Sequence, residues 1–290
     1  MYDFSPTITL FCHQIWKLDA KILLLQSSDE TMDVVTHQTP FHPVSHIWPD
    51  HPADKGTLNG CPVLDCKTGA IEQSSGKLYV GEAIPVKRDQ AGWVFVVVHC
   101  MAKEHNQFVV GETVMLAVDK PYQLSLSRGH SAGHLAALAL NKVLDTHGYW
   151  RKVADRTDCH GYYDFNSYAQ ESSFVKPDQC LDTYRLGKTL RKRGLNSADV
   201  LEDLVAIEAL VNQQVEQWLS LGSDIDIICC GRGLTDSRYW RCDLGEERVA
   251  QMPCGGTHAK NLNEYKGISV ILRQIDVQNI EMVTHATAEK

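Results

Sequence analysis

Two short segments, far apart in the sequence, each carry two metal-binding side chains four positions apart. The first is His130-Ser-Ala-Gly-His134, and the second is Cys254-Gly-Gly-Thr-His258. On a helix, residues four apart lie on one face, about one turn from each other. Together the segments supply three imidazoles and one thiolate, which suit a tetrahedral Zn²⁺ ion. This pattern predicts a fold that brings all four side chains to one point. It leaves open whether a metal there is structural or catalytic.

Each pair is weak evidence when taken alone. The chain has 13 histidines, so chance spacings of this kind arise, and His130 and His134 could simply pack on a helix. The second segment has two adjacent glycines, which are costly inside a helix. We therefore expect a loop there, in which the backbone can approach a metal or a substrate closely.

Composition and charge narrow the class of protein. The chain has 290 residues, of which 43% are hydrophobic and 22% charged, as in ordinary globular proteins with one large or two smaller domains. The net charge of −8, taken alone, disfavours nucleic acid as a partner, and we expect no binding of DNA. No apolar run reaches the roughly 18 residues of a membrane span, and no basic residue precedes the first apolar stretch, so we expect no membrane segment and no secretory signal. Ten scattered cysteines favour a reduced, cytoplasmic protein.

The hydrophobic pattern changes along the chain and predicts an α+β fold. Residues 1–122 are rich in short β-type runs with Gly and Pro between them, which predicts a small β-barrel-like domain. Residues 123–290 alternate helical and β-type patterns, which predicts a mixed α/β domain with an antiparallel-type sheet packed by helices. We expect strands at 92–98, 112–118, 226–230 and 268–275, and helices at 131–147 and 197–219.

The paired motifs resemble a known family. Arg128-Gly-His130-Ser-Ala-Gly-His134 with an intact Cys254-Gly-Gly-Thr-His258 resembles the editing domain of alanyl-tRNA and threonyl-tRNA synthetases, and more closely the free-standing alanyl-tRNA editing proteins of the AlaX type. The run from Phe41 to Gly60 also resembles the family's N-terminal segment. Residues 44–53 depart from it, because they contain no glycine where the family has a glycine-rich run with a Gln.

The resemblance implies a zinc-dependent hydrolase that acts in trans on mischarged tRNA(Ala). Such an aminoacyl-tRNA deacylase would cleave the ester of Ser-tRNA or Gly-tRNA, with one Zn²⁺ per chain and the aminoacylated acceptor end of tRNA as its partner. The altered run at 44–53 keeps a second reading open, a non-catalytic, zinc-stabilised RNA-binding module. A third is an unrelated zinc hydrolase of a small metabolite. The sequence leaves open the amino acid removed, the tRNA identity elements and the oligomeric state.

Particular side chains are candidates for each role. The predicted metal ligands are His130, His134, Cys254 and His258. The predicted catalytic groups are Asp54 and Thr257, and the predicted substrate-binding groups are Ser45 and Thr57. The predicted tRNA-binding cations are Arg128, Lys188, Arg191, Lys192 and Arg193. Each of these side chains could instead have a purely structural role. Asp54 could be a turn carboxylate, and Thr257, Ser45 and Thr57 could be ordinary structural hydroxyls. Arg128 could form a surface salt bridge, and the basic cluster could be a solvated helix end or loop.

Overall fold

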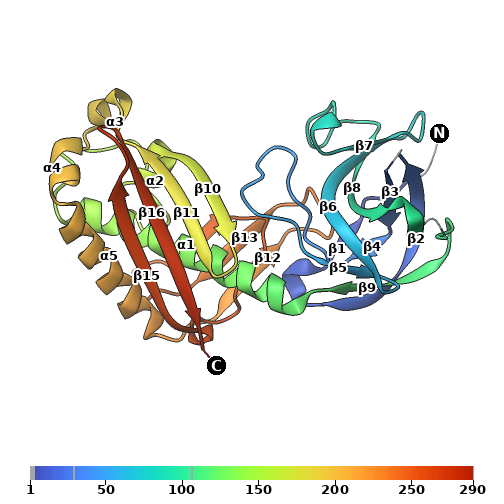
Figure 1. Ribbon diagram of the computed structural model, residues 1–290. Coiled ribbons are helices and arrows are strands. Elements are labelled where there is room, and N and C mark those ends of the chain that lie inside the picture. Colours follow the sequence, from blue (N-terminus) through green and yellow to red (C-terminus); the bar gives the residue numbers. More distant parts are fainter. Residues whose placement is uncertain (1–3, 29, 106, 290) are drawn as a thin grey trace. The chain divides into compact units, whose positions relative to one another are not determined.

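The structure is a computed structural model that describes residues 4–28, 30–105 and 107–289. The chain divides into two compact units (Figure 1). Unit 1 comprises Met1–Leu124, Cys229–Arg238 and Gly255–Thr257, and unit 2 comprises Ser125–Ile228, Tyr239–Cys254 and His258–Lys290. The mixed α and β character expected from the sequence is confirmed. The predicted domains, 1–122 and 123–290, remain a prediction, because compactness does not test independent folding.

Unit 1 is built on a seven-stranded antiparallel sheet with the order β5-β9-β2-β3-β8-β6-β7. Strand β5 pairs with both β9 and β6, so the sheet is ring-like. The strands are β1 (Ile8–Thr9), β2 (Lys17–Ser27), β3 (Thr31–Thr36), β4 (Gln38–Thr39), β5 (Gly56–Leu58), β6 (Cys61–Glu72), β7 (Leu78–Val80), β8 (Trp93–Ala102) and β9 (Thr113–Val118). Short 3-10 helices are η1 (Phe11–His13), η2 (Gly81–Ala83) and η3 (Lys103–His105).

Strand β8 explains why one run of this unit is apolar at nearly every position. Val97 and Met101 pack into one hydrophobic cluster, whereas Val96 and Val98 pack into another. Successive side chains of a strand point to opposite faces. Both faces of β8 are therefore buried, and the β-branched run predicted as a strand is confirmed.

Unit 2 contains a four-stranded antiparallel sheet with the order β10-β11-β16-β15 and a three-stranded sheet with the order β12-β13-β14. The strands are β10 (Gln170–Lys176), β11 (Gln179–Arg185), β12 (Ile225–Cys229), β13 (Arg238–Cys242), β14 (Ala250–Pro253), β15 (Tyr265–Gln274) and β16 (Asn279–Ala288). The helices are α1 (Lys120–Thr146), α2 (Phe165–Ala169), α3 (Lys188–Arg193), α4 (Ser197–Glu202), α5 (Leu204–Leu219) and the 3-10 helix η4 (Leu262–Glu264).

Two helix boundaries differ from the sequence prediction. Helix α1 begins at Lys120, eleven residues before the predicted start at 131. The Asp119 carboxylate accepts the N–H of Tyr122 at 3.1 Å, and Pro121 falls in the first turn, where its missing N–H costs nothing. The predicted helix 197–219 is two helices, because it is interrupted at Asp203, whose carboxylate accepts the Tyr149 hydroxyl at 3.1 Å.

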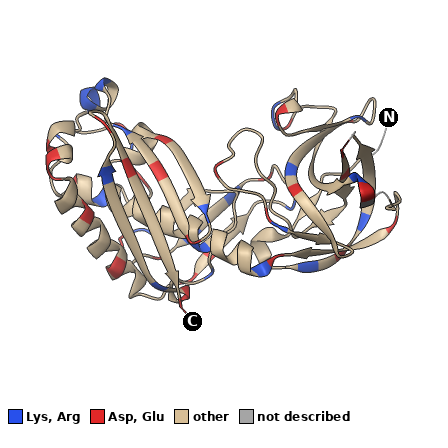
Figure 2. Cartoon of the chain, in the orientation of Figure 1, with Lys and Arg blue, Asp and Glu red and all other residues tan. Residues whose placement is uncertain are grey.

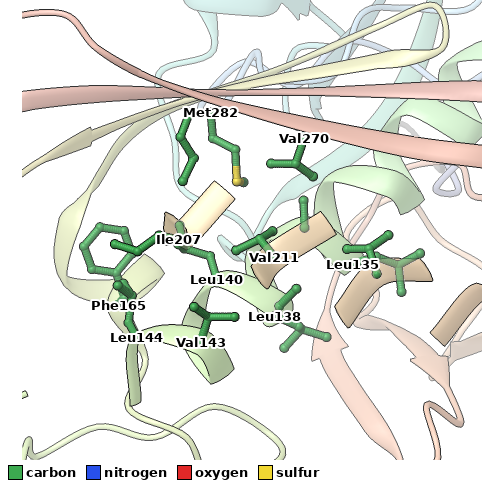
Figure 3. Close-up of a cluster of buried hydrophobic side chains, with 14 of the residues drawn as sticks. Leu135, Leu138, Leu140, Val143, Leu144, Phe165, Ile207, Val211, Val270 and Met282 are labelled. Atoms are coloured by element: carbon green, nitrogen blue, oxygen red, sulfur yellow. The ribbon is translucent and has the colours of Figure 1, made fainter. Parts of the chain in front are cut away.

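The core of unit 2 lies between α1, α5 and the four-stranded sheet (Figure 3). The predicted apolar face of α1 is buried, with Leu135 and Leu140 at 0% and 1% exposure. Helix α5 contributes Ile207 and Val211, and the sheet contributes Met282. Burying large aliphatic side chains stabilises a fold by roughly 1.5–3 kcal/mol each. This packing fixes α1, whose middle carries two of the predicted metal ligands.

Helix α5 also covers the edge of the sheet at β15. The Asn212 carboxamide donates to the Val270 carbonyl at 2.7 Å and accepts the Val270 N–H at 2.8 Å. One turn earlier, the Glu208 carboxylate accepts the Leu272 N–H at 2.7 Å. Side chains of the helix thus satisfy backbone groups that a neighbouring strand would otherwise bind. Within the described residues, no helix has the length and apolar character needed to span a membrane.

Candidate metal centre

Helix α1 presents His130 and His134 on one face, with glycines one position before each. A Cβ atom on Gly133 would lie 2.7 Å from the Cys180 sulfur, and one on Gly129 would lie 2.5 Å from the Lys176 carbonyl oxygen. A side chain at either position would have to displace its neighbours. The glycines therefore let α1 lie directly against the β10–β11 hairpin, which sets where the two imidazoles lie.

Cys254 and His258 lie on the loop that follows β14. Residues 254–259 contain neither helix nor strand, as the paired glycines predict. A Cβ atom on Gly255 would meet nothing within 4 Å, so this glycine is not required by packing.

The four predicted ligands come together in unit 2. Their donor atoms all lie within 4.8 Å of one another. The Cys254 sulfur lies 3.1 Å from the Nε2 atom of His258, 3.3 Å from that of His134 and 3.4 Å from that of His130. Sulfur and nitrogen ligands of a tetrahedral zinc ion are separated by about 3.5 Å, given Zn–S and Zn–N bonds of about 2.3 and 2.0–2.1 Å. The donor set and its spacing thus fit zinc, and this cluster could hold a metal ion.

The surroundings of the cluster suit metal binding. Burial lowers the pKa of His134 to about 4, which keeps the imidazole in the neutral form that binds metals. The Nδ1 atom of His258 lies 3.1 Å from the Ser131 hydroxyl oxygen, which also accepts the Ala259 N–H at 3.2 Å. An outer hydrogen bond of this kind fixes the ring and directs Nε2 toward the position of a metal. The ring of Trp240 contacts His134 edge-on, with ring centroids 5.4 Å apart.

A cavity of about 540 Å³ lies beside this cluster in unit 2, and His130 and His134 form part of its wall. This volume is in the range of small-molecule sites, roughly 300–1,000 Å³. Its other polar lining residues include Asn141, Asp158, Asp164, Asn166, Gln170, Ser173 and Asp182. None of these was predicted as a site residue. Of these residues, Asp182 could have been recognised from the sequence. It is an acidic residue that alternates with Cys180 and Tyr184 on the buried side of a strand.

The predicted catalytic groups Asp54 and Thr257 lie in unit 1, and both are buried. The Asp54 carboxylate accepts the His42 N–H at 2.7 Å and the Gln123 side chain at 2.6 Å. Burial raises the pKa of Asp54 to about 7, and the nearby charge of Asp119 adds to the shift. The Thr257 hydroxyl lies 3.2 Å from Nε2 of His51.

The predicted substrate-binding groups Ser45 and Thr57 are also in unit 1. The Ser45 hydroxyl accepts the N–H groups of Ile47 and Trp48 at 3.3 and 3.2 Å, which stabilises the local turn. Thr57 lies on β5 opposite Ala117 of β9. These contacts give Ser45 a structural function of its own.

The predicted tRNA-binding cations fall into two groups. Arg128 on α1 forms an ion pair with Asp178, with 2.6 Å between Nε and Oδ1. The other four lie on α3 (Figure 2), where Lys188, Arg191 and Lys192 are exposed. Arg193 pairs with Asp155 at 2.5 Å and lies over the Tyr168 ring, 4.8 Å from its centroid. The basic cluster is therefore a short helix rather than a loop.

The chain is similar to proteins of alanyl-tRNA synthesis and editing. No protein-family model matches it. It is 26% identical over 276 residues to the alanyl-tRNA editing protein AlaX-M of Pyrococcus horikoshii, which covers 93% of this chain and 92% of that protein. It is 23% identical to the alanine–tRNA ligase of Sinorhizobium medicae and 27% identical to that of Thermotoga maritima, over 93% and 91% of this chain. The chain spans about a quarter of those ligases, 27% and 26%. The resemblance predicted from the two motifs is confirmed.

Proposed function

We propose that this chain is a zinc-dependent hydrolase that removes serine or glycine from mischarged tRNA(Ala), acting in trans in the cytoplasm. One observation carries the proposal. In a chain that resembles an alanyl-tRNA editing protein over 93% of its length, three imidazole nitrogens lie 3.1–3.4 Å from one cysteine sulfur. The similarity supports editing of tRNA(Ala) in general, and the cluster supports the zinc-dependent form of the reaction.

The chemistry required of the protein is modest, because an aminoacyl ester is already activated. Bound zinc would supply a Lewis acid for the ester carbonyl or an activated water. The residues that would hold it are His130, His134, Cys254 and His258. Ser131 would orient the His258 ring, and burial keeps His134 neutral. The cavity beside His130 and His134 would hold the aminoacyl group away from bulk water.

Four protein ligands usually indicate a structural zinc site, whereas a catalytic site keeps an open position. The proposal therefore requires that the coordination shell of the zinc ion either accepts water or substrate as a fifth ligand or releases one of its four protein ligands. The two cases differ in the effect of single substitutions. Loss of one ligand from a structural site should lower stability and activity together. Loss of a loosely held catalytic ligand should lower turnover much more than stability.

Serine and alanine differ by one hydroxyl group. A site built to bond that hydroxyl discriminates strongly, because its own polar groups are left unpaired when alanine binds. The proposal keeps Ser45 and Thr57 as substrate-binding groups and Asp54 and Thr257 as groups that act on the ester. Alanine variants that keep the thermal stability of the wild type but lose discrimination would identify which of them contact substrate.

The substrate would reach the protein through its RNA. The exposed cations Lys188, Arg191 and Lys192 of α3 are the proposed contacts with the tRNA backbone, with Arg193 beside them. Arg128 is the proposed contact nearer the acceptor end, although its ion pair with Asp178 would have to rearrange or be shared.

A deacylation assay tests the function. The protein is incubated with Ser-, Gly- and Ala-tRNA(Ala), with and without a zinc chelator. We expect loss of Ser or Gly but not of Ala, and inhibition by the chelator. His147→Ala is the control for the ligand variants, because His147 lies exposed just beyond the end of α1. Binding of tRNA without turnover would favour the non-catalytic module, to which the altered run at 44–53 points. Neither binding nor turnover would favour a hydrolase of a small metabolite.

A further inference from the structure

The cavity beside the metal cluster has an acidic wall and no cationic one. Three carboxylates line it, from Asp158, Asp164 and Asp182, and neither Lys nor Arg is among its described lining residues. A group that enters this cavity from solution meets both these carboxylates and the imidazoles of His130 and His134.

Two of the three carboxylates are used by the local backbone. The Asp158 Oδ1 atom accepts the N–H groups of His160, Gly161 and Tyr162 at 2.9–3.1 Å. The Asp164 Oδ1 atom accepts the Ser167 N–H at 3.0 Å and caps α2. Both carboxylates therefore have structural functions that account for their positions.

The Asp182 carboxylate differs from these two, because within the described part of the chain it accepts no hydrogen bond from a backbone N–H. It lies on β11 in phase with Cys180, which faces α1 at Gly133. Its side chain is 3% exposed. Its Oδ1 atom accepts the Gln170 Nε2–H at 2.9 Å, its Oδ2 atom lies 3.6 Å from the Cys180 sulfur, and the Ser173 hydroxyl is a further hydrogen-bond partner of the carboxylate.

A buried carboxylate with only neutral donors is energetically costly unless a cation joins it. Among the ion pairs of the described residues, none includes Asp182. Burial raises the pKa of Asp182 to about 6, so a bound cation would favour its ionised form. The site is therefore suited to a small cationic group that arrives with the substrate.

An aminoacyl ester carries such a group, because its α-ammonium is attached to the carbon next to the ester carbonyl. We infer that Asp182 binds the α-ammonium group of the aminoacyl ester and thereby directs the ester carbonyl toward His130 and His134, which line the same cavity. Gln170 acts as a positioning residue that holds the carboxylate. This inference rests on the proposed function and adds a recognition group for its substrate.

The test compares two substrates that differ only in this group. One is Ser-tRNA(Ala), and the other is the same tRNA after nitrous acid has replaced the α-ammonium by a hydroxyl. Wild-type protein should cleave the seryl ester with kcat/KM higher by roughly 10- to 100-fold, the usual value of a hydrogen bond to a charged partner. Asp182→Asn keeps the shape and the acceptor for Gln170 but loses the charge. It should lower the preference for the seryl ester by roughly 10-fold or more relative to the wild type, by slowing only the seryl ester.

Matched variants separate recognition from folding. Glu171→Gln removes an exposed carboxylate of β10 that pairs with Arg185 at 3.4 Å outside the cavity, and it should keep the wild-type preference. Gln170→Ala leaves the Asp182 charge in place but removes one of the groups that hold the carboxylate, and it should reduce the preference only in part. It also serves as the second variant if Asp182→Asn fails to fold, as judged by thermal melting.

The outcomes distinguish this inference from the proposed function. Equal cleavage of both esters by the wild type would overturn the inference alone. So would a preference that Asp182→Asn retains, or an equal loss on both esters, which indicates a structural role. Cleavage of neither ester by the wild type would overturn the proposed function and the inference together.

Discussion

Cys254 is the side chain on which the metal centre depends, because its sulfur is the atom that all three imidazoles approach. Cys254→Ala removes the thiolate and leaves three nitrogens, and His134→Ala removes one nitrogen from a closed set. We expect bound zinc to fall from about one ion per chain to near zero in Cys254→Ala and to well under half in His134→Ala. Elemental analysis of the purified proteins measures this.

His147→Ala is the matched control for zinc content, since it removes an exposed imidazole outside the cluster. Its zinc content should equal that of the wild type. Unchanged zinc in all of the ligand variants would show that the cluster does not bind the metal.

Asp54 makes the stability of the chain depend on pH. Burial raises the pKa of this carboxyl from 3.8 to about 7. Between these two values the folded chain holds a proton that the unfolded chain has released, so this group's contribution to the free energy of unfolding falls as pH rises from about 4 to 7. Asp54→Asn cannot titrate. Its free energy of unfolding relative to the wild type should therefore increase by about 2–3 kcal/mol between pH 5 and pH 8.

Urea unfolding at the two pH values measures this difference, and pH effects of other groups cancel in the comparison. Asp19→Asn, at an exposed position of β2, is the control for the substitution itself. A difference for Asp54→Asn that is the same at pH 5 and pH 8 would mean that the Asp54 carboxyl is already ionised in the folded chain at pH 5.

The close approach of α1 to the β10–β11 hairpin favours glycine at position 133 despite its helical position. Alanine favours a helix by about 1 kcal/mol over glycine, but its Cβ would lie 2.7 Å from the Cys180 sulfur. Overpacking usually costs about 1–3 kcal/mol, so the net effect of Gly133→Ala should be a loss of up to about 2 kcal/mol. Thermal or urea unfolding measures it. Gly267→Ala on β15, where a Cβ would meet nothing within 4 Å, is the control. A stabilised Gly133→Ala protein would contradict the packing described here.

Helix α3 should account for much of the salt dependence of tRNA binding. Replacing Lys188, Arg191 and Lys192 by Gln should flatten the plot of log K against log salt by about one unit for each phosphate that the helix no longer neutralises. Arg193→Gln should have a smaller effect, because Arg193 is already paired with Asp155. Filter-binding titrations at several salt concentrations measure these slopes.

A control for charge alone replaces three exposed lysines of unit 1, Lys17, Lys21 and Lys87, by Gln. This triple variant carries the same net charge as the triple variant of α3. An equal flattening in both would indicate a general charge effect, and an unchanged slope in the α3 variant would remove the helix from the interface.

Across the chain, the parts of the fold that follow local patterns were predictable from sequence. The apolar periodicity of α1 and the β-branched run of β8 predict the elements that the structure contains. The spacing of the HxxxH and CxxxH motifs points to four side chains that lie within 4.8 Å of one another.

The parts that depend on contacts distant in sequence were not predictable. The break between α4 and α5 occurs at Asp203, which bonds to Tyr149, 54 residues away. In the sequence, Asp182 is simply one acidic residue in a strand. Only the packing of β11 against α1 shows that it lines a cavity together with two candidate metal ligands. Which hydroxyl or carboxyl group contacts substrate likewise depends on tertiary arrangement, not on residue type.

The carboxamide of Asn212 has a consequence for how copies of this chain behave in a crowded cell. It forms hydrogen bonds with both the N–H and the carbonyl of Val270, so these backbone groups of the edge strand β15 cannot pair with another strand. A strand from another molecule would have to displace a helix before it could extend the sheet there. Resistance to fibril growth along β15 is thus a property of two side chains on α5, Asn212 and Glu208, and it is independent of whether a metal is bound.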